Sequence, residues 1–153
     1  MKIYLDVSCL NRPFDDQTQV RIRLEAEAVL LILERFDDGA WEQVSSDMAA
    51  IETDAMPDRD RRARVRLLLP EEKTILKLTA AVWKRASELE PLGFKPADAV
   101  HVAAAEHSGA DVLLRLSFDD RLCRLAKRRA RQLRVRVANP VDWLKEVGNG
   151  PNS

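Results

Sequence analysis

Short strand-like segments alternate along this chain with longer segments of helical periodicity. Alternation of this kind predicts an α/β fold, in which parallel strands form one central sheet and the connecting helices cover both of its faces. We therefore expect a three-layer α/β/α domain with a central, mainly parallel sheet of about four strands. The predicted strands cover residues 2–5, 41–46, 110–117 and 133–139.

Helical periodicity predicts most of the connecting segments. Residues 19–36 carry apolar side chains at three- and four-residue steps, and Gly39 marks the end of that helix. Residues 9–16, CLNRPFDD, are expected to form a loop because they contain the helix-breaking Pro13. Further helices are predicted around Glu52 and over residues 57–69, 72–90, 97–109, 119–131 and 140–147.

The length and composition favour one domain. The chain has 153 residues, of which 46% are hydrophobic, so we expect a single domain over residues 1–147 and a disordered tail over residues 148–153. Cys9 and Cys123 give neither a disulfide framework nor the spacing of a zinc site. The opening MKIYLDVS fits neither a signal peptide nor a membrane span, which favours a cytoplasmic protein without membrane association.

The formal net charge is zero, with 25 basic and 25 acidic residues, but the charge is unevenly distributed. Residues 121–136 contain eight basic residues and no acidic one, which leaves 17 basic against 25 acidic residues elsewhere. Such asymmetry suits a protein that binds phosphates in one place and cations in another, although a solvated basic helix gives the same pattern. The candidate phosphate ligands are Arg124, Arg128, Arg131 and Arg134, with Arg59, Arg62 and Arg66 as a second stripe.

Two aspartates directly follow predicted strands. Asp6 comes after the first strand, and Asp119 takes the matching place after the third, with Ser117 before it and Asp120 next to it. Functional groups of an open parallel sheet gather beyond the carboxyl ends of its strands, so Asp6 and Asp119 are expected to meet at one edge. Each aspartate taken alone is equally well explained as a turn former or a helix cap.

Two further carboxylates lie in predicted helices. Asp98 begins a helix that is otherwise nearly apolar, so its carboxylate needs a partner, which either a bound cation or the helix N-terminus would supply. Glu52 stands about one turn after the strand end at Ser46, where a solvated helix position is an equally good interpretation. His101 is one turn from Asp98 and either pairs with it, lines the crevice or is a buried core histidine.

Four oxygen ligands without a histidine or cysteine cluster favour a hard cation such as Mg²⁺ or Mn²⁺ over zinc.

With these residues in place, the sequence resembles PIN-domain proteins, including the VapC-type toxin ribonucleases of prokaryotic toxin–antitoxin pairs. The resemblance covers nearly the whole chain. It rests on MKIYLDVSCLNRPFDDQ, SSDMAAIE, KPADAVHVAAAEHSGADVLL and SFDDRL, the last of which is similar to the family's T-x-D pattern.

The resemblance implies a PIN-like fold and marks four residues as catalytic metal ligands: Asp6, Glu52, Asp98 and Asp119. It also implies Ser117 as a supporting hydroxyl. Two features depart from the family pattern. Val7 and Ser8 stand where a threonine or cysteine often follows the first aspartate. In ADVLLRLSFDD, the interval from the strand to the acid is two residues longer than is usual in the family. If that extra length shifts the register, Asp120 replaces Asp119.

The family implies hydrolysis of an RNA phosphodiester assisted by Mg²⁺ or Mn²⁺, with an antitoxin protein as a possible partner. The spacing of the arginines suits RNA phosphates along one face, but both stripes could equally bind an acidic antitoxin segment or nothing. The alternative is a catalytically silent PIN-like module that acts by binding protein or RNA. A phosphatase with an aspartate nucleophile fits less well, because no second aspartate stands two residues after Asp6. The helices over residues 19–36 and 72–90 are expected to form either a homodimer surface or an ordinary core face.

Overall fold

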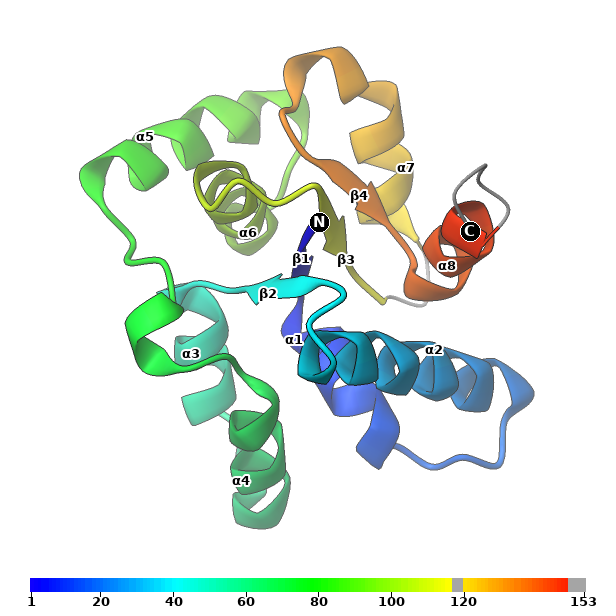
Figure 1. Ribbon diagram of the computed structural model, residues 1–153. Helices are drawn as coiled ribbons and strands as arrows, with labels where there is room; N and C mark the ends of the chain where they lie inside the picture. Colours follow the sequence, from blue (N-terminus) through cyan, green and yellow to red (C-terminus); the bar gives the residue numbers. More distant parts are fainter. Residues whose placement is uncertain (117–119, 149–153) are drawn as a thin grey trace.

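The computed structural model describes residues 1–116 and 120–148 of the chain. Within these residues, the strands β1 (Lys2–Leu5), β2 (Glu42–Val44), β3 (Val112–Leu114) and β4 (Arg136–Ala138) form one parallel sheet. The strand order is β2-β1-β3-β4, so β1 and β3 are the central pair (Figure 1). The predicted α/β class and parallel sheet are confirmed.

Helices cover both faces of the sheet (Figure 1). One face carries α1 (Val7–Asn11), α2 (Val20–Asp37) and α8 (Pro140–Gly148), and the other carries α5 (Ala80–Leu89), α6 (Pro96–His107) and α7 (Arg121–Arg128). The helices α3 (Asp47–Asp54) and α4 (Arg59–Leu68) follow β2. Short 3-10 turns are η1 (Arg12–Phe14), η2 (Glu72–Thr74), η3 (Glu90–Leu92) and η4 (Ala130–Gln132).

The two faces have separate hydrophobic cores because neighbouring side chains of a strand point to opposite sides. Ile3 and Leu5 of β1 pack with Val29 of α2 in one core. Tyr4 belongs to the other core, together with the alanine-rich face of α6. These three residues of β1 are almost completely buried, so β1 is the centre of the domain.

A short helix, α1, lies where the sequence predicts a loop. It begins directly after Asp6, whose side chain accepts a hydrogen bond from the backbone N–H of Ser8 and so caps the helix. Pro13 falls in the first turn of η1, where the missing N–H of proline does no harm. The expected loop is therefore a capped helical turn followed by a 3-10 turn.

The helix predicted over residues 72–90 is wrong in its first half, because α5 begins only at Ala80. Leu76 forms an isolated parallel bridge with Ser46, in which Leu76 N donates to Ser45 O and Asp47 N donates to Leu76 O, both at 2.9 Å. This pairing extends the end of β2 and holds the segment before α5 in an extended conformation. Tertiary pairing therefore overrides the local helical periodicity.

Two other boundaries fall short of their predictions. β3 ends at Leu114 instead of at residue 117, and α7 ends at Arg128 instead of at residue 131. At the C-terminus, α8 includes Gly148, and residues 149–153 of the predicted tail lie outside the described residues. In the part of the chain that the structure describes, no helix is both long enough and apolar enough to cross a membrane.

The carboxyl ends of the strands define where a site can form. Asp6 follows β1 and Arg115 follows β3, and these two strands are neighbours in register through the pair Leu5 and Leu114. The helices that follow them cover opposite faces of the sheet, so the crevice between β1 and β3 is a topological switch point. Ligands of open α/β sheets bind at such points.

Candidate active site

Asp6 is held by its own neighbours at the end of β1. Its Oδ2 atom accepts hydrogen bonds from Ser8 N at 3.1 Å and from Ser8 Oγ at 2.6 Å. Ser8 Oγ in turn accepts a bond from Leu116 N at 3.0 Å, which ties the start of α1 to the end of β3. The helix cap and the site therefore share one carboxylate, and Oδ1 remains directed to the crevice.

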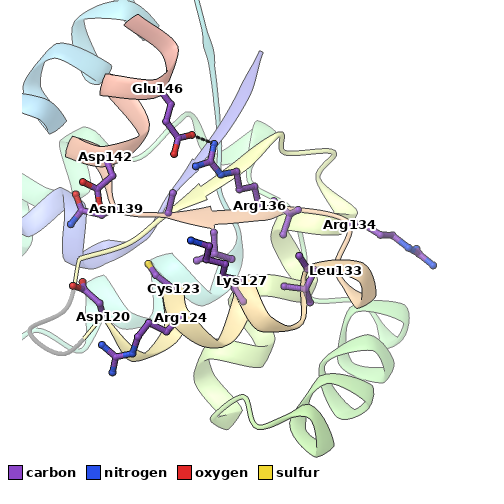
Figure 2. Close-up of a pocket in the computed structure, with 15 residues that line it drawn as sticks. Asp120, Cys123, Arg124, Lys127, Leu133, Arg134, Arg136, Asn139, Asp142 and Glu146 are labelled. Carbon is purple, nitrogen blue, oxygen red and sulfur yellow. Dashed lines mark ion pairs between the residues drawn. The ribbon is translucent and has the colours of Figure 1, made fainter. Parts of the chain in front are cut away.

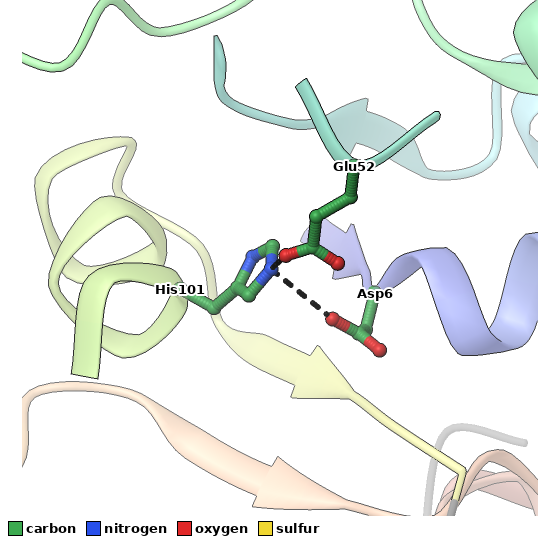
Figure 3. Close-up of side chains that lie close together, drawn as sticks. All are labelled: Asp6, Glu52 and His101. Atoms are coloured by element: carbon green, nitrogen blue, oxygen red, sulfur yellow. Dashed lines mark hydrogen bonds and ion pairs between the residues drawn. The ribbon is translucent and has the colours of Figure 1, made fainter. Parts of the chain in front are cut away.

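His101 lies in α6 with its ring between the sheet and α3 (Figure 3). Its Nδ1 atom lies 2.8 Å from Tyr4 Oη, and Tyr4 Oη lies 2.7 Å from Ser46 Oγ. Its Nε2 atom hydrogen-bonds to Glu52 and lies 3.5 Å from Asp6 Oδ1. His101 is thus a satisfied buried histidine whose Nε2 atom faces both Glu52 and Asp6.

The surroundings of His101 and Tyr4 fix their protonation. Burial lowers the pKa of His101, but the hydrogen bond with Glu52 and the charges of Asp6 and Glu52 outweigh it, and the pKa rises above 6.5. Burial raises the pKa of Tyr4 far above its ordinary value, so its phenol keeps its proton. The hydrogen bond to Glu52 requires a proton on Nε2, and a divalent ion would have to displace that proton before Nε2 could bind it.

Glu52 comes from α3 and reaches the same point from the other side of the crevice. Its side chain is one-third exposed, whereas Asp6 and His101 are buried. One ligand atom from each of Asp6, Glu52 and His101 lies within 4.8 Å of the other two (Figure 3). The structure thus brings together two of the four predicted acids, with a histidine that the sequence left open.

Asp98 has a different partner. Its carboxylate forms an ion pair with Nη1 of Arg115, the first residue after β3. Within the described residues, Asp98 lies outside the group of Asp6, Glu52 and His101. Lys95 precedes α6, and Asp98 lies in the first turn of that helix. The partner that this carboxylate requires is therefore a cation from the chain itself.

Arg115 connects Asp98 to the rest of the cluster. Burial lowers its pKa, but the nearby charges of Asp6, Asp98 and Glu52 raise it, and the net change is upward. Its guanidinium thus stays charged in the field of these acids. Arg115 has no sequence motif of its own, and the one signal for it is the two-residue extension of the segment after β3.

The other predicted residues of the acid site divide into two groups. Ser117 and Asp119 lie outside the described residues. Asp120 precedes α7 with a left-handed φ of 50°, a conformation that aspartate tolerates better than most residues. Its carboxylate is half exposed and lies 3.7 Å from Nη2 of Arg21 in α2. Asp120 is thus directed to α2.

The predicted arginine face is divided between two segments. Arg124 and Arg128 lie in α7, whereas Arg131 lies in η4 and Arg134 follows it. The four side chains therefore do not continue along one helix. The second stripe is partly engaged within the chain, because Arg62 donates to Met56 O and Arg66 pairs with Asp54.

A hollow of about 720 Å³ lies between α7, β4 and α8 (Figure 2). Arg124 and Lys127 line it from α7, and Asp142 lines it from α8. Figure 2 shows Arg136 paired with Glu146 across this hollow, while Arg134 extends away from it. Both basic and acidic side chains line this hollow, so the charge of the basic segment is partly neutralised.

The donor set fits a divalent cation. Asp6 and Glu52 offer carboxylate oxygens and His101 offers an imidazole nitrogen, all within reach of one ion. Carboxylates suit Mg²⁺ and Mn²⁺, and a nitrogen ligand favours a first-row ion such as Mn²⁺. The hydrogen bonds from Ser8 to Asp6 and between Tyr4 and His101 resemble the outer-shell bonds that orient ligands in metal sites.

Comparison with known proteins agrees with this fold. The chain belongs to the PIN-domain family, whose model, described as "PIN domain", matches residues 3–128. The resemblance seen in the sequence is therefore confirmed. No curated protein matches the chain.

Two solved structures share the fold. FitAcB from Neisseria gonorrhoeae has a TM-score of 0.58 at 15% identity, with 90% of this chain and 97% of that chain covered. VapBC2 from Rickettsia felis, in a structure with a DNA fragment from its promoter, has a TM-score of 0.54 at 12% identity. The match covers 91% of this chain and 98% of that chain. At these identities the similarity concerns the fold alone.

Proposed function

We propose that this chain is a divalent-metal-dependent ribonuclease that hydrolyses RNA phosphodiesters. The observation that carries the proposal is the convergence of Asp6, Glu52 and His101 at the switch point of a PIN-domain sheet. PIN domains are generally nucleases, and a compact group of carboxylates at this edge is the arrangement that metal-assisted phosphodiester hydrolysis requires.

In this proposal, Asp6 and Glu52 hold the ion, with Nε2 of His101 as a further ligand. Asp98 and Asp119 remain proposed ligands from the sequence. A bound ion supplies polarisation of the phosphate and activation of a water for attack. Two further residues orient these side chains by hydrogen bonds: Ser8 holds the Asp6 carboxylate, and Tyr4 holds the ring of His101.

We extend the proposal to protein partners, either an antitoxin or a second copy of this chain. The resemblance to VapC-type toxins supports it, as does the similarity of the fold to FitAcB and VapBC2. On α2, Val20, Leu24 and Leu31 are 60%, 50% and 40% exposed and fall on one side of the helix. An exposed apolar row of this kind supports binding to another protein.

The second candidate is the silent module that binds RNA or protein without cleavage. The ion pair between Asp98 and Arg115 favours it, because it neutralises one acid of the cluster within the chain. A protonated His101 would similarly offset one of the two negative charges of Asp6 and Glu52. In the ribonuclease, divalent ions must compete with these internal cations.

Cleavage of end-labelled structured RNAs in Mn²⁺, Mg²⁺ or EDTA tests the proposal. Wild type is compared with Asp6→Asn and Glu52→Gln, and with Asp37→Asn, which removes one exposed carboxylate from the end of α2. We expect metal-dependent cleavage by wild type and Asp37→Asn that is absent from both site variants, with folding intact by circular dichroism. No cleavage by wild type, and no thermal stabilisation by either ion, would establish the silent module instead.

A further inference from the structure

A second, smaller hollow of about 230 Å³ adjoins the acid cluster. It lies where the end of β3 meets the starts of α6 and α7. Three of its lining residues are cations and one is an acid: Lys95, Arg115, Arg121 and Asp98. The remaining lining residues are a glycine, an alanine and leucines. Its charged lining is therefore mainly basic, in contrast to the carboxylates of Asp6 and Glu52.

Arg115 belongs to both places. It lines the hollow, and it interacts electrostatically with Asp6, Asp98 and Glu52. Its side chain is one-quarter exposed, so the guanidinium is neither fully buried nor free in solvent. A ligand in the hollow would therefore contact an arginine that also feels the charges of the proposed cleavage centre.

The guanidinium of Arg115 retains unused hydrogen-bonding capacity. A guanidinium has five N–H donors, and within the described residues only Nη1 has a side-chain acceptor, which is Asp98. Its Nε atom is buried without a hydrogen-bond partner among those residues. Because Nε is buried, the donors that a ligand in the hollow could reach are those of the terminal nitrogens, and among the described residues a side chain engages only Nη1.

The other two cations border the same hollow from separate helices. Lys95 stands immediately before α6, and Arg121 is the first residue of α7. Both side chains are exposed. The positive end of the dipole of α6 adds to their charge. Three cations that converge from three elements on one small hollow suit a compact anion better than an apolar ligand.

We propose that this hollow binds a backbone phosphate of the RNA next to the one at the acid cluster, with Arg115 as the positioning residue that links the two. The inference rests on the proposed function and names the residues that orient its substrate. Arginine forms a planar fork that matches phosphate oxygens. A strand whose scissile phosphate is bound by the ion that Asp6 and Glu52 would hold would continue into the hollow beside Asp98.

Binding of a labelled single-stranded RNA in EDTA, followed by fluorescence anisotropy, tests this without cleavage. The test variant is Lys95→Gln/Arg121→Gln, and the control is Lys84→Gln/Arg23→Gln, which removes one exposed lysine and one exposed arginine from α5 and α2. We expect roughly a three- to tenfold weaker affinity in the test variant than in the control. The salt dependence of binding should be shallower by about 0.7 for each RNA phosphate that the test variant no longer neutralises.

Inorganic phosphate should compete with RNA in wild type and much less in the test variant. Equal RNA affinity in test and control variants, or no RNA binding by wild type, would overturn the proposal. Polyglutamate is a second probe, which stands in for an acidic protein segment. If the test variant keeps its RNA affinity but no longer binds polyglutamate, the proposal is overturned as well, because the hollow then binds an acidic protein. If wild type binds RNA as expected but never cleaves it, the proposed function fails while this inference stands.

The role of Arg115 is tested separately with Arg115→Gln and Arg115→Lys. If Arg115 positions the RNA, Arg115→Gln should bind RNA more weakly than wild type. Arg115→Lys should recover part of the affinity, because it keeps the positive charge but lacks the planar guanidinium that pairs with two phosphate oxygens. In an active enzyme, KM should change more than kcat. Identical RNA affinity in both variants and wild type, with folding intact, would contradict the role.

Discussion

Oη of Tyr4 lies 2.8 Å from Nδ1 of His101, although 97 residues separate them in the chain. The hydrogen bond is buried and orients the imidazole so that Nε2 faces Glu52 and Asp6. Tyr4 therefore influences the candidate ion site without touching it. Its role can be separated from that of the carboxylates by removing a single hydroxyl.

We predict that Tyr4→Phe weakens both the fold and the ion site. The change leaves buried polar atoms of His101 and Ser46 without their partner, which costs about 1–3 kcal/mol in the free energy of unfolding. Affinity for Mn²⁺ should fall by roughly tenfold or more, as is typical when a group that orients a metal ligand is removed. Urea denaturation and calorimetric titration measure the two effects, and an unchanged Mn²⁺ affinity would contradict the orienting role.

The stability of the metal-free protein should depend on the protonation of His101. Its folded-state pKa is raised above 6.5, so folding favours the protonated ring. The resulting stabilisation is complete below the unfolded pKa of about 6.5 and disappears as the pH rises through the higher folded-state value. Urea denaturation in EDTA at several pH values should show this decrease, and His101→Gln should flatten it. The same slope in variant and wild type would exclude His101 as its source.

Removal of the charge of Arg115 should change ion binding in the opposite direction to removal of an acid. Arg115 competes with divalent ions for the carboxylates, because it pairs with Asp98 and lies in the field of Asp6. We predict that Arg115→Gln binds Mn²⁺ about three- to tenfold more tightly and is less stable than wild type in EDTA. Calorimetric titration checks the first effect. A weaker Mn²⁺ affinity would instead make Arg115 a support of the ion site.

A buried ion pair far from the chemistry should matter for stability alone. Glu25 of α2 is buried, with its carboxylate 3.3 Å from Nε of Arg12 and 3.2 Å from Nδ2 of Asn139. Glu25→Ala leaves the buried Nε of Arg12 without its carboxylate partner, although Nη1 of Arg12 still pairs with Asp15 at 3.1 Å, so the free energy of unfolding should fall by about 1–3 kcal/mol. Glu27→Ala, at an exposed position of the same helix, is the control. Equal stability of the two variants would contradict this account.

Much of the fold could be predicted because its signals are local. The strand-like runs and the helical periodicity of residues such as Val29 place the elements in the correct order. The errors have tertiary causes. The pairing of Leu76 with Ser46 shortens a predicted helix, and the cap supplied by Asp6 creates α1 where proline suggests a loop.

The site could be predicted only in part. Asp6 follows from its place after a strand, and Glu52 from its helix and the family resemblance. The pairing of Asp98 with Arg115 could not be predicted, because it depends on where a long side chain turns after β3. The position of Tyr4 was accessible in principle, since alternation along β1 directs it away from Ile3 and Leu5 and toward α6.

The central claim is that the acid cluster at the end of β1 is a divalent-ion centre. The most direct test is anomalous diffraction from crystals of the protein soaked in Mn²⁺. The account predicts one anomalous peak coordinated by Asp6 and Glu52, with Nε2 of His101 turned toward it, and no such peak in crystals of Asp6→Asn. An empty cluster in wild type, with His101 still bonded to Glu52 at saturating Mn²⁺, would contradict the claim.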